Sequence, residues 1–335
     1  MKTLPRWCLL FVAIFSTVHT VHAQDLWAVY KGKDGPGKGK HIVLISGDEE
    51  YRSEEALPQL GKILADHHGF KCTVLFAIDP ADGTIHPNKS NIPGLEALDT
   101  ADLMILALRF RDLPDAQMKH IADYVASGKP IMGLRTATHS FNIKNGKTYA
   151  KYSWNSRDWD GGFGRQILGE TWVNHHGTHG KQSTRGLIAT GMENNPIVKG
   201  IKSGDIWGPT DVYTVRLPLP AGCQPVIMGE VLVGMNKTDK ALEGPKNDPM
   251  MPVAWIRTLK GADGKTTRVF TTTMGASQDL LNEGLRRLLV NATYWTLGME
   301  AQILPDSSVA IVGPYHPRPF SFNGFQKGVR PRDLK

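Results

Sequence analysis

The sequence is poor in cysteine, and this scarcity limits the chemistry that it can carry out. Only Cys8, Cys72 and Cys223 occur among its 335 residues, and Cys8 lies in an N-terminal apolar segment. The remaining two cysteines are too few for a disulfide framework. Neither of them belongs to a Cys-x-x-Cys pair or stands beside a histidine, which argues against a redox or nucleophilic thiol. We expect two buried thiols.

A long apolar run is also absent after the first residues of the chain. The early run, Trp7–Val18, follows Lys2 and Arg6, and the small residue Ala23 ends the segment. This layout is typical of a secretory signal peptide. No later run approaches the ~18 to 20 apolar residues that a membrane helix requires, so no membrane span is predicted. We expect cleavage of residues 1–23 and a periplasmic or secreted protein.

The sequence lacks the features of nucleic-acid-binding and nicotinamide-dependent proteins. The formal charge of +7 falls by two without the signal peptide. The basic residues that remain gather near the chain ends without interleaved aromatics, so no nucleic-acid partner is predicted. No Gly-x-Gly-x-x-Gly motif follows the first predicted strand, which excludes the usual dinucleotide-binding turn. The oligomeric state has no signature in the sequence.

The order of strand and helix patterns predicts an α/β fold. Residues 24–40 are rich in glycine and lysine, and we expect them to form a flexible lead-in. Four runs are apolar almost throughout, as in strands covered on both faces: residues 41–46, 71–77, 102–108 and 130–135. Helical patterns occur between Ser53 and Gly69 and between Pro114 and Gly128. Such an order predicts a doubly wound, mostly parallel, flavodoxin-like sheet.

The second half of the chain is less regular and predicts a β-rich extension of the same sheet. Its strand candidates are residues 184–190, 211–217, 225–232, 252–259 and 268–274. An apolar helical stripe then runs from Leu281 to Trp295, and Gly298 closes the helix. Without an internal repeat or a break in composition, residues 41–300 are predicted to form one domain. The tail, residues 301–335, holds too much proline and glycine for regular structure, but its aromatics predict docking on the body.

The carboxyl ends of the predicted parallel strands define the candidate ligand site. The polar residues that follow these strands are Asp48, Glu49, Glu50 and Arg52, then Arg109 and Arg111, then Arg135, Thr136, Thr138 and His139, and finally Gly275–Asp279. Arginine forks can orient an anionic or polyhydroxylated molecule, while carboxylates and imidazoles can move protons. Structural roles are the alternative: an acidic helix start, paired cations, or a buried hydrogen-bonded histidine.

A glycine-flanked loop, WVNHHGTHGK, places His175, His176 and His179 close together. A zinc site made by these residues alone is disfavoured, because adjacent side chains such as His175 and His176 usually diverge. We expect one or two of the three to contact a ligand over the pocket, with a structural role as the alternative. Trp154 and Trp172 offer faces on which a sugar ring can stack.

Five segments of the chain resemble the ThuA-like (trehalose-utilisation) proteins, whose fold is that of the class I glutamine amidotransferases. These segments are IVLISGDEEYRSEEALPQLGKIL, MGLRTATHSF, GGFGRQILGETWVNHHGTHG, GDIWGPTDVY and RVFTTTMGASQDL. The resemblance spans nearly all of residues 41–300 and is most specific to exported ThuA-like proteins of environmental bacteria. It implies carbohydrate metabolism, with disaccharides and their 3-keto derivatives as the substrate class.

Departures from the amidotransferases argue against glutamine hydrolysis. Those enzymes carry a nucleophilic cysteine at the turn after the strand that corresponds to PIMGL, where this chain has Arg135-Thr136-Ala137. They carry a histidine near the end of the last sheet strand, where this chain has Met274-Gly275-Ala276. Both the nucleophile and the base are therefore missing. The glycine-histidine pair that ThuA-like proteins commonly have at that place is missing as well.

Together these features predict an exported enzyme that acts on a small carbohydrate, such as a keto sugar or a glycoside. The predicted proton-transfer residues are His139, His176, Glu49 and Glu50. The predicted substrate-binding residues are Arg109, Arg111, Arg135, Thr136, His175, His179, Trp172 and Asp211. The carbon beside a sugar carbonyl is acidic, so a modest base with cations near the enolate oxygen can drive isomerisation or β-elimination. This chemistry needs no cofactor.

Two other classes of function stay open on the sequence alone. One is a non-catalytic sugar-binding or assembly protein that keeps the pocket of the fold without its nucleophile. The other is a metal-dependent hydrolase that uses the loop His175–His179 together with Asp211. Metal analysis tests the second, and a screen of sugars followed by product analysis separates a binder from an enzyme.

Overall fold

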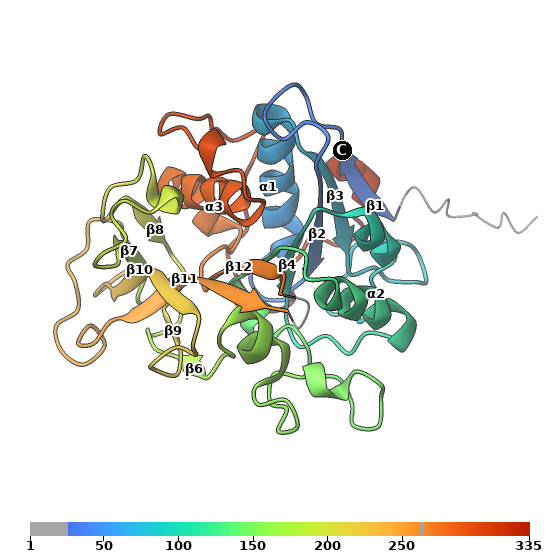
Figure 1. Ribbon diagram of the computed structural model, residues 1–335, viewed down its shortest axis with the longest axis horizontal. Coiled ribbons are helices and arrows are strands. Elements are labelled where there is room, and N and C mark those ends of the chain that lie inside the picture. Colours follow the sequence, from blue (N-terminus) through green and yellow to red (C-terminus); the bar gives the residue numbers. More distant parts are fainter. Residues whose placement is uncertain (1–25, 262–263) are drawn as a thin grey trace, which may run out of the picture.

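A ten-stranded sheet forms the centre of the molecule (Figure 1). The computed structural model describes residues 26–261 and 264–335, so the predicted signal peptide, residues 1–23, lies outside the described residues. In spatial order the strands of the sheet are β1 (Trp27–Tyr30), β3 (Lys71–Phe76), β2 (His41–Gly47), β4 (Leu103–Leu108), β5 (Ile131–Leu134), β12 (Thr266–Thr272), β11 (Met251–Lys260), β10 (Cys223–Val231), β7 (Thr184–Ile188) and β8 (Ile206–Gly208). Within these two ranges, no helix is long and apolar enough to cross a membrane.

The parallel half of the sheet consists of β3, β2, β4, β5 and β12. Alternate residues of β2 face two separate core layers: Ile42 and Leu44 belong to one, and Val43 and Ile45 belong to the other. All four side chains are fully buried. Burial on both faces explains why these runs are apolar throughout instead of alternating with polar residues. The predicted parallel strands are confirmed.

Helices cover both faces of the parallel half (Figure 1). α1 (Ser53–His68) and α3 (Glu283–Thr296) bury their leucines in one core layer, whereas α2 (Asp115–Ala126) buries Met118 in the other. α1 ends at Gly69, which has a φ of 80°. Glycine adopts this left-handed conformation without strain and so closes the helix. This half is the doubly wound part of the predicted fold.

The other half of the sheet is antiparallel, and the prediction of a mostly parallel sheet is wrong in this respect. β12, β11, β10, β7 and β8 pair antiparallel in turn, and β1 pairs antiparallel with β3. Among the described strands, four neighbouring pairs of this sheet are parallel and five are antiparallel. Antiparallel neighbours need only a short connection, and β10, β11 and β12 follow one another along the chain. The result is a mixed sheet with the predicted β-rich extension.

Residues 211–217 do not join the main sheet as predicted. Only Tyr213–Thr214 form a strand, β9, which pairs with β6 (Asn174–His175) in a separate two-stranded sheet. Beside this pairing, the amides of His176 and Gly177 both donate to the carbonyl of Val212 (2.9 and 3.0 Å). The small sheet therefore fixes the histidine loop next to Asp211.

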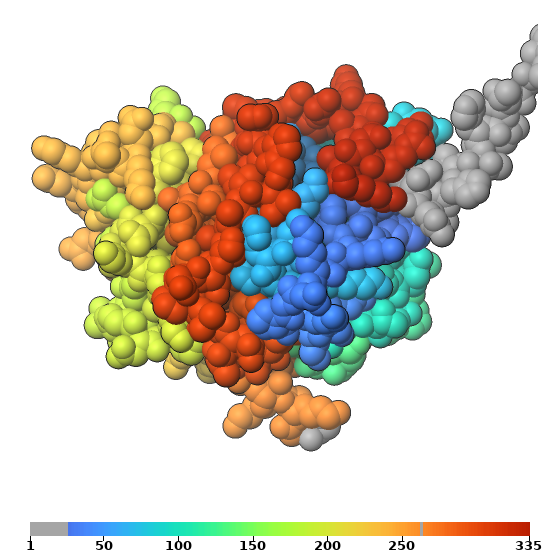
Figure 2. All heavy atoms as spheres, turned by 90° about the horizontal axis from the view of Figure 1, so that it is seen from above, coloured from blue at the N-terminus to red at the C-terminus, as the bar shows by residue number. Residues whose placement is uncertain are grey.

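Both ends of the described chain pack on the body. β1 lies within residues 24–40, so the prediction of a flexible lead-in is wrong for this strand. Nε2 of His68 in α1 hydrogen-bonds the carbonyl of Ser308 (2.8 Å), and the hydroxyl of Tyr30 donates to the carbonyl of Leu334 (2.8 Å). Figure 2 shows the C-terminal segment (red) on the same face as α1 (light blue) and α3 (orange-red).

The two described cysteines are both free thiols. Cys72 is fully buried in β3, and burial raises the pKa of its thiol. Cys223, at the start of β10, is partly exposed. The expectation of two buried thiols is therefore confirmed for Cys72 and wrong for Cys223.

Candidate functional site

The turns at the carboxyl ends of the parallel strands are tied together by backbone hydrogen bonds. The amide of Phe110 donates to the carbonyl of His139 (2.9 Å), which joins the turns after β4 and β5. The amide of Arg135 donates to the carbonyl of Met274 (3.1 Å), which adds the turn after β12. Segments far apart in the sequence therefore lie side by side at one edge of the sheet, where ligands bind in open α/β folds.

Asp48 organises the turn between β2 and α1. Its carboxylate accepts hydrogen bonds from the amides of Glu50 (2.8 Å) and Tyr51 (3.1 Å), and from the hydroxyl of Thr136 (2.8 Å). Aspartates commonly stabilise turns by accepting from amides that follow them. Thr136 is fully buried, so its hydroxyl holds this turn and does not reach a substrate.

Non-glycine residues at this edge adopt the left-handed backbone conformation. Arg52, Phe110 and Arg135 have φ values of 59°, 50° and 46°, and Asn323 of the tail has 58°. This conformation costs an L-residue about 1–2 kcal/mol. Such strain persists only where surrounding contacts fix it, and it gathers at functional sites. The strained turns therefore mark the same edge as the strand rule does.

Two arginines hold Glu49. Nη1 of Arg109 lies 2.5 Å from Oε1 of Glu49, and Nη2 of Arg111 lies 2.7 Å from Oε2. Arg111 also donates to the carbonyls of Pro87 and Lys89. Its side chain is 6 % exposed, against 18 % for Arg109. The structure thus brings both predicted clamps to Glu49, but only Arg109 is open enough to contact a ligand.

Arg135 is buried beneath the site. Its guanidinium carbon lies 4.2 Å from the ring centre of Tyr51 and 3.9 Å from that of Tyr213, so two cation–π contacts enclose it. Nη1 donates to the carbonyls of Asp211 (2.8 Å) and Thr273 (2.6 Å), and Nη2 donates to Oδ1 of Asp211 (2.8 Å). Arg135 is 1 % exposed, so it positions Asp211 and does not clamp a substrate directly.

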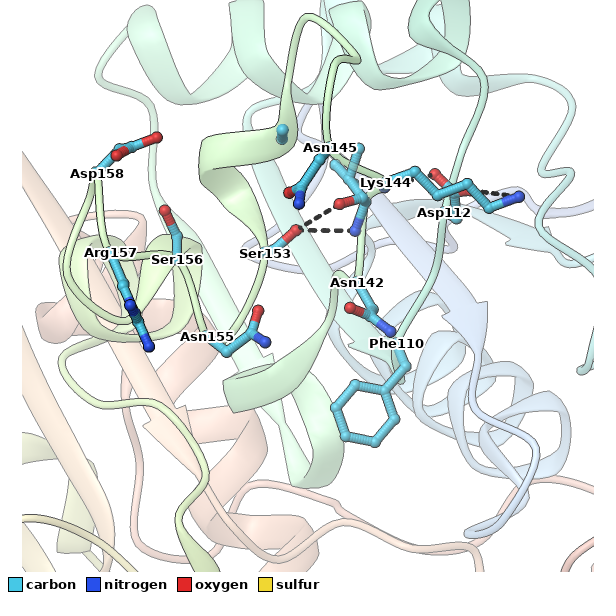
Figure 3. A pocket seen from close by; sticks show the side chains of 12 residues that line it. Phe110, Asp112, Asn142, Lys144, Asn145, Ser153, Asn155, Ser156, Arg157 and Asp158 are labelled. Atoms are coloured by element: carbon cyan, nitrogen blue, oxygen red, sulfur yellow. Dashed lines mark hydrogen bonds and ion pairs between the residues drawn. The ribbon is translucent and has the colours of Figure 1, made fainter.

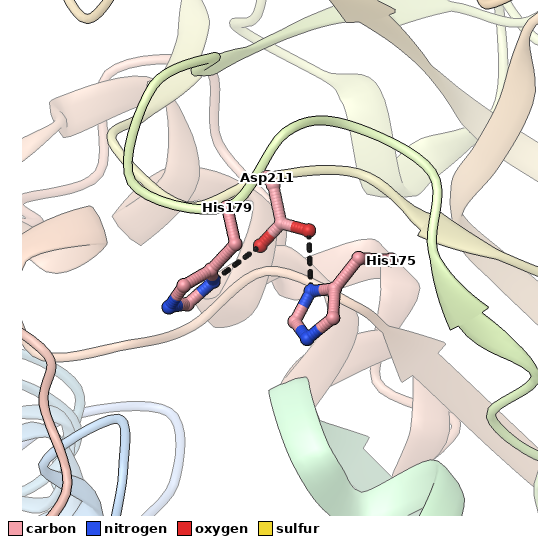
Figure 4. Close-up of side chains that lie close together, drawn as sticks. All are labelled: His175, His179 and Asp211. Carbon is pink, nitrogen blue, oxygen red and sulfur yellow. Dashed lines mark hydrogen bonds and ion pairs between the residues drawn. The ribbon is translucent and has the colours of Figure 1, made fainter.

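Asp211 lies between two histidines of the loop (Figure 4). Nδ1 of His175 is 2.7 Å from its Oδ2, and Nδ1 of His179 is 3.2 Å from its Oδ1. Burial alone would raise the pKa of Asp211, but the two histidine hydrogen bonds and the charge of Arg135 hold this pKa well below its ordinary value. Both imidazoles are 36 % exposed. An ionised, buried carboxylate therefore orients two rings that reach solvent.

A second carboxylate, Glu50, faces His179, one of these two histidines. Its Oε1 lies 3.5 Å from Nε2 of His179, and its Oε2 lies 3.2 Å from Nε of Arg109. Burial raises the pKa of Glu50, and the charge of Arg109 offsets this effect only in part. Glu50 therefore keeps its proton to a higher pH than an ordinary glutamate, which suits a proton donor.

The imidazole of His139 is buried among three aromatic rings. Its ring centre is 4.8 Å from that of Phe110, 5.3 Å from that of Trp172 and 5.9 Å from that of Tyr213. Burial, helped by the charges of two nearby arginines, lowers the pKa of His139 far below its ordinary value. The imidazole is therefore neutral at neutral pH. Trp172 is less buried, and its ring also contacts that of His175 (5.9 Å).

The structure places His176 away from the other predicted site residues. Its Nε2 hydrogen-bonds the carbonyl of Lys246 (2.8 Å). His175 lies in strand β6, where successive side chains point to opposite sides, so His176 faces away from Asp211. The loop then brings His179 back to Asp211, and Gly180, the next residue, has a φ of 69°.

The C-terminal tail forms one wall of the site, which the sequence does not indicate. The ring centre of Phe320 lies 4.9 Å from that of His179 and 5.5 Å from that of Tyr51. The amide of Ser321 donates to the carbonyl of Glu50 (2.9 Å). Tyr51 has a weak signal, a large aromatic inside the charged turn DEEYR. Apart from the aromatic content of the tail, no signal identifies Phe320.

The fold and this edge define an α/β protein with a polar candidate site, rich in carboxylates and imidazoles, at the carboxyl ends of its parallel strands. The chain belongs to the ThuA family, described as trehalose utilisation, whose model matches residues 42–296. The match runs from β2 to the end of α3 and includes the histidine loop and Asp211. Among curated proteins, none matches the chain.

Solved structures of ThuA-like proteins from two bacteria are similar to this chain. The protein from Bacteroides uniformis ATCC 8492 is 14% identical, with a TM-score of 0.47 over 79% of this chain and 93% of that chain. The protein from Parabacteroides merdae ATCC 43184 is 14% identical, with a TM-score of 0.47 over 78% of this chain and 90% of that chain. The residues of the site, rather than these likenesses, carry the argument about function.

Proposed function

We propose that this protein is an enzyme that carries out acid–base chemistry on a small sugar, with a keto sugar or a glycoside as substrate. The observation that carries the proposal is the Asp211–His175 pair, in which a buried carboxylate lies 2.7 Å from Nδ1 of a partly exposed imidazole. When Nδ1 donates to Asp211, the lone pair of Nε2 is free to accept a proton. The family description, trehalose utilisation, supports a sugar as the substrate.

The histidine of this pair and two other residues of the site have the chemistry that the reaction needs. His175 is the proposed base. Glu50 is the proposed acid, because burial raises its pKa and favours the protonated form. Arg109 is the proposed cation for a developing oxyanion, because its guanidinium is the more open of the two that hold Glu49.

Proton transfer is assigned to His175 in preference to the two histidines that the sequence suggested. His139 is 2 % exposed and packs against the ring of Trp172, so it is too buried to reach a substrate directly. The Nε2 atom of His176 is already hydrogen-bonded to the carbonyl of Lys246. His139 instead supports the floor of the site, and His176 anchors the loop.

The reaction on a 3-keto glycoside proceeds by proton abstraction and β-elimination. His175 removes the proton from the carbon beside the carbonyl, and the electron pair moves to the carbonyl oxygen, which Arg109 stabilises. The enolate then expels the glycosidic oxygen from the neighbouring carbon, and Glu50 gives this oxygen its proton. If a proton is instead added to the opposite face of the same carbon and the leaving group is kept, the outcome is isomerisation by inversion at that carbon. Both routes balance without an oxidant or reductant.

Two neighbouring histidine variants test the assignment. His175→Ala is expected to lower the turnover of 3-keto-trehalose by about 10²–10⁴-fold, the usual contribution of a positioned base. His176→Ala removes the same side chain one residue away and is the matched control, with a loss of less than about tenfold expected. Equal effects of the two substitutions would contradict the proposal. Binding of the sugar by the wild-type protein without any product would indicate a sugar-binding protein instead.

Metal-dependent hydrolysis is the second candidate, and the same cluster favours it. One ligand atom from each of His175, His179 and Asp211 lies within 4.8 Å of the other two. Three protein ligands of this kind suit catalytic Zn²⁺, and two histidines with a carboxylate also suit Fe²⁺. A metal ion held there would supply an activated water molecule for attack on a glycosidic bond.

Metal analysis separates the two candidates. Acid–base chemistry at His175 predicts that turnover survives dialysis against EDTA. Metal-dependent hydrolysis predicts about one equivalent of metal in the purified protein, loss of turnover on chelation, and recovery when Zn²⁺ is returned.

We also propose that the protein acts in the periplasm or outside the cell, because residues 1–23 have the layout of a signal peptide. N-terminal sequencing of exported protein is expected to begin at Gln24. Recovery of the uncleaved chain from the cytoplasm alone would contradict this proposal.

A further inference from the structure

The C-terminal tail crosses the candidate site between two buried anchors. Val309 is 3 % exposed and belongs to the core layer in which α1 and α3 bury their leucines. Phe325 is 7 % exposed, and its ring centre lies 4.8 Å from that of His86. Between these anchors, none of the residues 310–324 is buried. A stretch with so few buried contacts can open locally while the rest of the fold stays intact.

Two exposed residues in the left-handed backbone conformation lie at the ends of the part of the tail that covers the site. Gly313 has a φ of 70°, and Asn323 has a φ of 58°. Glycine adopts this conformation readily, and asparagine adopts it more easily than most residues. The hinges of mobile loops are a few residues at which the backbone can turn in this way. We call residues 313–323 the flap.

Phe320 and Phe322 form the side of the flap that faces the site. The ring centre of Phe320 lies 4.9 Å from that of His179 and 5.5 Å from that of Tyr51. The ring centre of Phe322 lies 5.0 Å from the guanidinium carbon of Arg109. The flap therefore covers one histidine of the loop and the cation that is proposed to stabilise the oxyanion.

The cover over Arg109 differs from the opening beside it. The guanidinium carbon of Arg109 also lies 4.8 Å from the ring centre of Phe110. Phe110 lines a cleft of about 650 Å³, whose other lining residues are Asp112 and residues between 142 and 158 (Figure 3). Among the described residues of the flap, none lines this cleft. The cleft is therefore an opening of the body itself, whereas Phe322 leaves Arg109 when the flap moves.

Hydrogen bonds that are not fully buried latch the flap to the turn after β12 and to the start of α1. The hydroxyl of Tyr315 donates to the carbonyl of Ser277 (2.7 Å), and the hydroxyl of Ser277 donates to the carbonyl of Arg318 (3.1 Å). The amide of Arg318 donates to Oε2 of Glu55 (2.8 Å). Water can replace the partners of such bonds, so each of them contributes only modestly to the closed position.

A second set of hydrogen bonds joins the flap to the turn that carries Glu49 and Glu50. The amide of Ser321 donates to the carbonyl of Glu50 (2.9 Å). Nη2 of Arg52 donates both to the carbonyl of Ser321 (2.9 Å) and to the carbonyl of Glu49. Movement of the flap therefore removes a backbone contact of Glu50, the proposed acid, together with the aromatic cover.

We propose that the flap is a lid that opens to admit the ligand and closes over His179 and Arg109. This inference rests on the proposed function, since it assigns the conformational control of the same site. A closed lid excludes water, which strengthens the interaction of Arg109 with a developing oxyanion and protects an enolate from side reactions. The lid lies beyond residue 296, where the match to the ThuA family ends.

Hydrogen–deuterium exchange of the backbone amides, followed residue by residue by NMR, tests whether the flap opens as a unit. The reporters are the amides of Arg318 and Ser321, which are bonded to the body in the closed position. In the wild type they are expected to exchange together. They should exchange at least about tenfold faster than the amide of Ile85, which donates to the carbonyl of Val329 (2.8 Å) beyond the flap.

Two tyrosine variants show whether the latch controls this opening. Tyr315→Phe keeps the ring and removes the hydroxyl that bonds Ser277, so the two reporter amides should exchange about two- to tenfold faster. Tyr30→Phe is the matched control, because it removes a hydroxyl that bonds the carbonyl of Leu334 (2.8 Å), which is in the tail but outside the flap. It should leave both reporters unchanged. Ser277→Ala removes the donor to Arg318 and is a second latch variant with the same expected direction.

Labelling of histidines with diethyl pyrocarbonate, read by mass spectrometry, measures whether the flap covers the site. Phe320→Ala gives the labelling rate of His179 without its cover, and this rate should exceed that of the wild type about two- to tenfold. Tyr315→Phe should give an intermediate rate. His120, which is partly exposed and pairs with Asp99, should be labelled equally fast in all of these proteins.

Three results would each overturn the lid: reporter amides that exchange no faster than Ile85, equal effects of Tyr315→Phe and Tyr30→Phe, or an unchanged labelling rate of His179 in Phe320→Ala. Neither measurement uses turnover, so the lid and the proposed function fail separately. Full turnover by His175→Ala would refute the catalytic assignment and leave the lid, whereas a flap that does not open would refute the lid and leave the catalytic assignment.

Discussion

Asp211→Asn is the substitution whose effect follows most directly from the contacts of the site. It keeps the size of the side chain and removes the charge that faces Arg135, whose guanidinium is 1 % exposed. Breaking a buried ion pair from one side costs about 3–5 kcal/mol. Arg135 keeps the carbonyls of residues 211 and 273 and its two tyrosine rings. We therefore expect Asp211→Asn to lower the unfolding free energy by an amount at the lower end of this range, about 3 kcal/mol.

Urea denaturation followed by circular dichroism measures this loss. Asp99→Asn is the matched control, because Asp99 also pairs with a histidine, His120 at 3.2 Å, but is 62% exposed. Exposed pairs contribute about 0–1 kcal/mol, so the control should change stability little. If the unfolding free energy of the Asp211→Asn variant lies within about 1 kcal/mol of that of the wild type, the buried pair of Arg135 and Asp211 does not stabilise the fold as expected.

The pH dependence of stability tests the same carboxylate. The pKa of Asp211 is lower in the folded chain than its ordinary value of about 3.9. Its contribution to stability is therefore fully present above pH of about 4 and is lost as the pH falls towards the folded value. The unfolding free energies of the wild type and Asp211→Asn should converge below that pH. If the two curves of unfolding free energy against pH stayed parallel, they would contradict a lowered pKa of Asp211 in the folded chain.

Three further predictions concern Glu50, Phe320 and His68. Glu50→Gln should lower turnover about 10²-fold. In the wild type, activity should fall as rising pH deprotonates Glu50, and this fall should occur at a pH above the ordinary glutamate pKa of about 4.3. Profiles of rate against pH for both proteins check these two expectations. Phe320→Ala removes the ring that packs on His179. We expect kcat to fall about tenfold, while the unfolding free energy changes by only about 0.5–1.5 kcal/mol. Equal kcat values for the variant and the wild type would show that the tail is not a wall of the site. Burial lowers the pKa of His68 to about 4, so the unfolded chain binds the proton more tightly than the folded chain. The unfolding free energy should therefore fall by up to about 3 kcal/mol as the pH drops from about 6.5 to 4. In urea titrations of the His68→Gln variant, this dependence of the unfolding free energy on pH should be absent.

The parallel half of the fold could be predicted because its strands are unambiguous in the sequence. Runs such as IVLI in β2 are apolar on both faces, and only a sheet covered by helices on both sides accommodates them. The antiparallel half has no comparable signal, because β10 and β11 mix buried and partly exposed residues. The strand β1 was missed for a different reason. It has four residues beside a stretch rich in glycine and lysine, and only its pairing with β3 stabilises it.

The candidate site could be predicted in position but not in detail. The strand-end rule correctly brought Glu49, Arg109 and Arg135 to one edge, because parallel strands end there. It could not show that Arg135 is buried between two tyrosines, since this depends on β9, far away in the sequence. Which of His175 and His176 faces Asp211 depends on the pairing of the two-residue strand β6. No local pattern specifies so short a strand.

The metal hypothesis illustrates the same limit. Spacing alone disfavoured a site made by the loop histidines, and the structure agrees that His175 and His176 diverge. The cluster forms nevertheless, because His179 returns to the same carboxylate as His175. A candidate third ligand from another segment, Asp211, therefore matters more to this hypothesis than the spacing within the loop.

Hydrogen–deuterium exchange on the substrate tests the central claim most directly. When 3-keto-trehalose is incubated with the protein in D₂O, mass spectrometry and NMR report whether deuterium enters at the carbon beside the carbonyl. The proposed acid–base site predicts rapid incorporation or elimination with the wild type and with His176→Ala, and a rate near that of the buffer with His175→Ala. Incorporation that is equally fast with His175→Ala, or absent with the wild type, would contradict a proton-transferring base at His175.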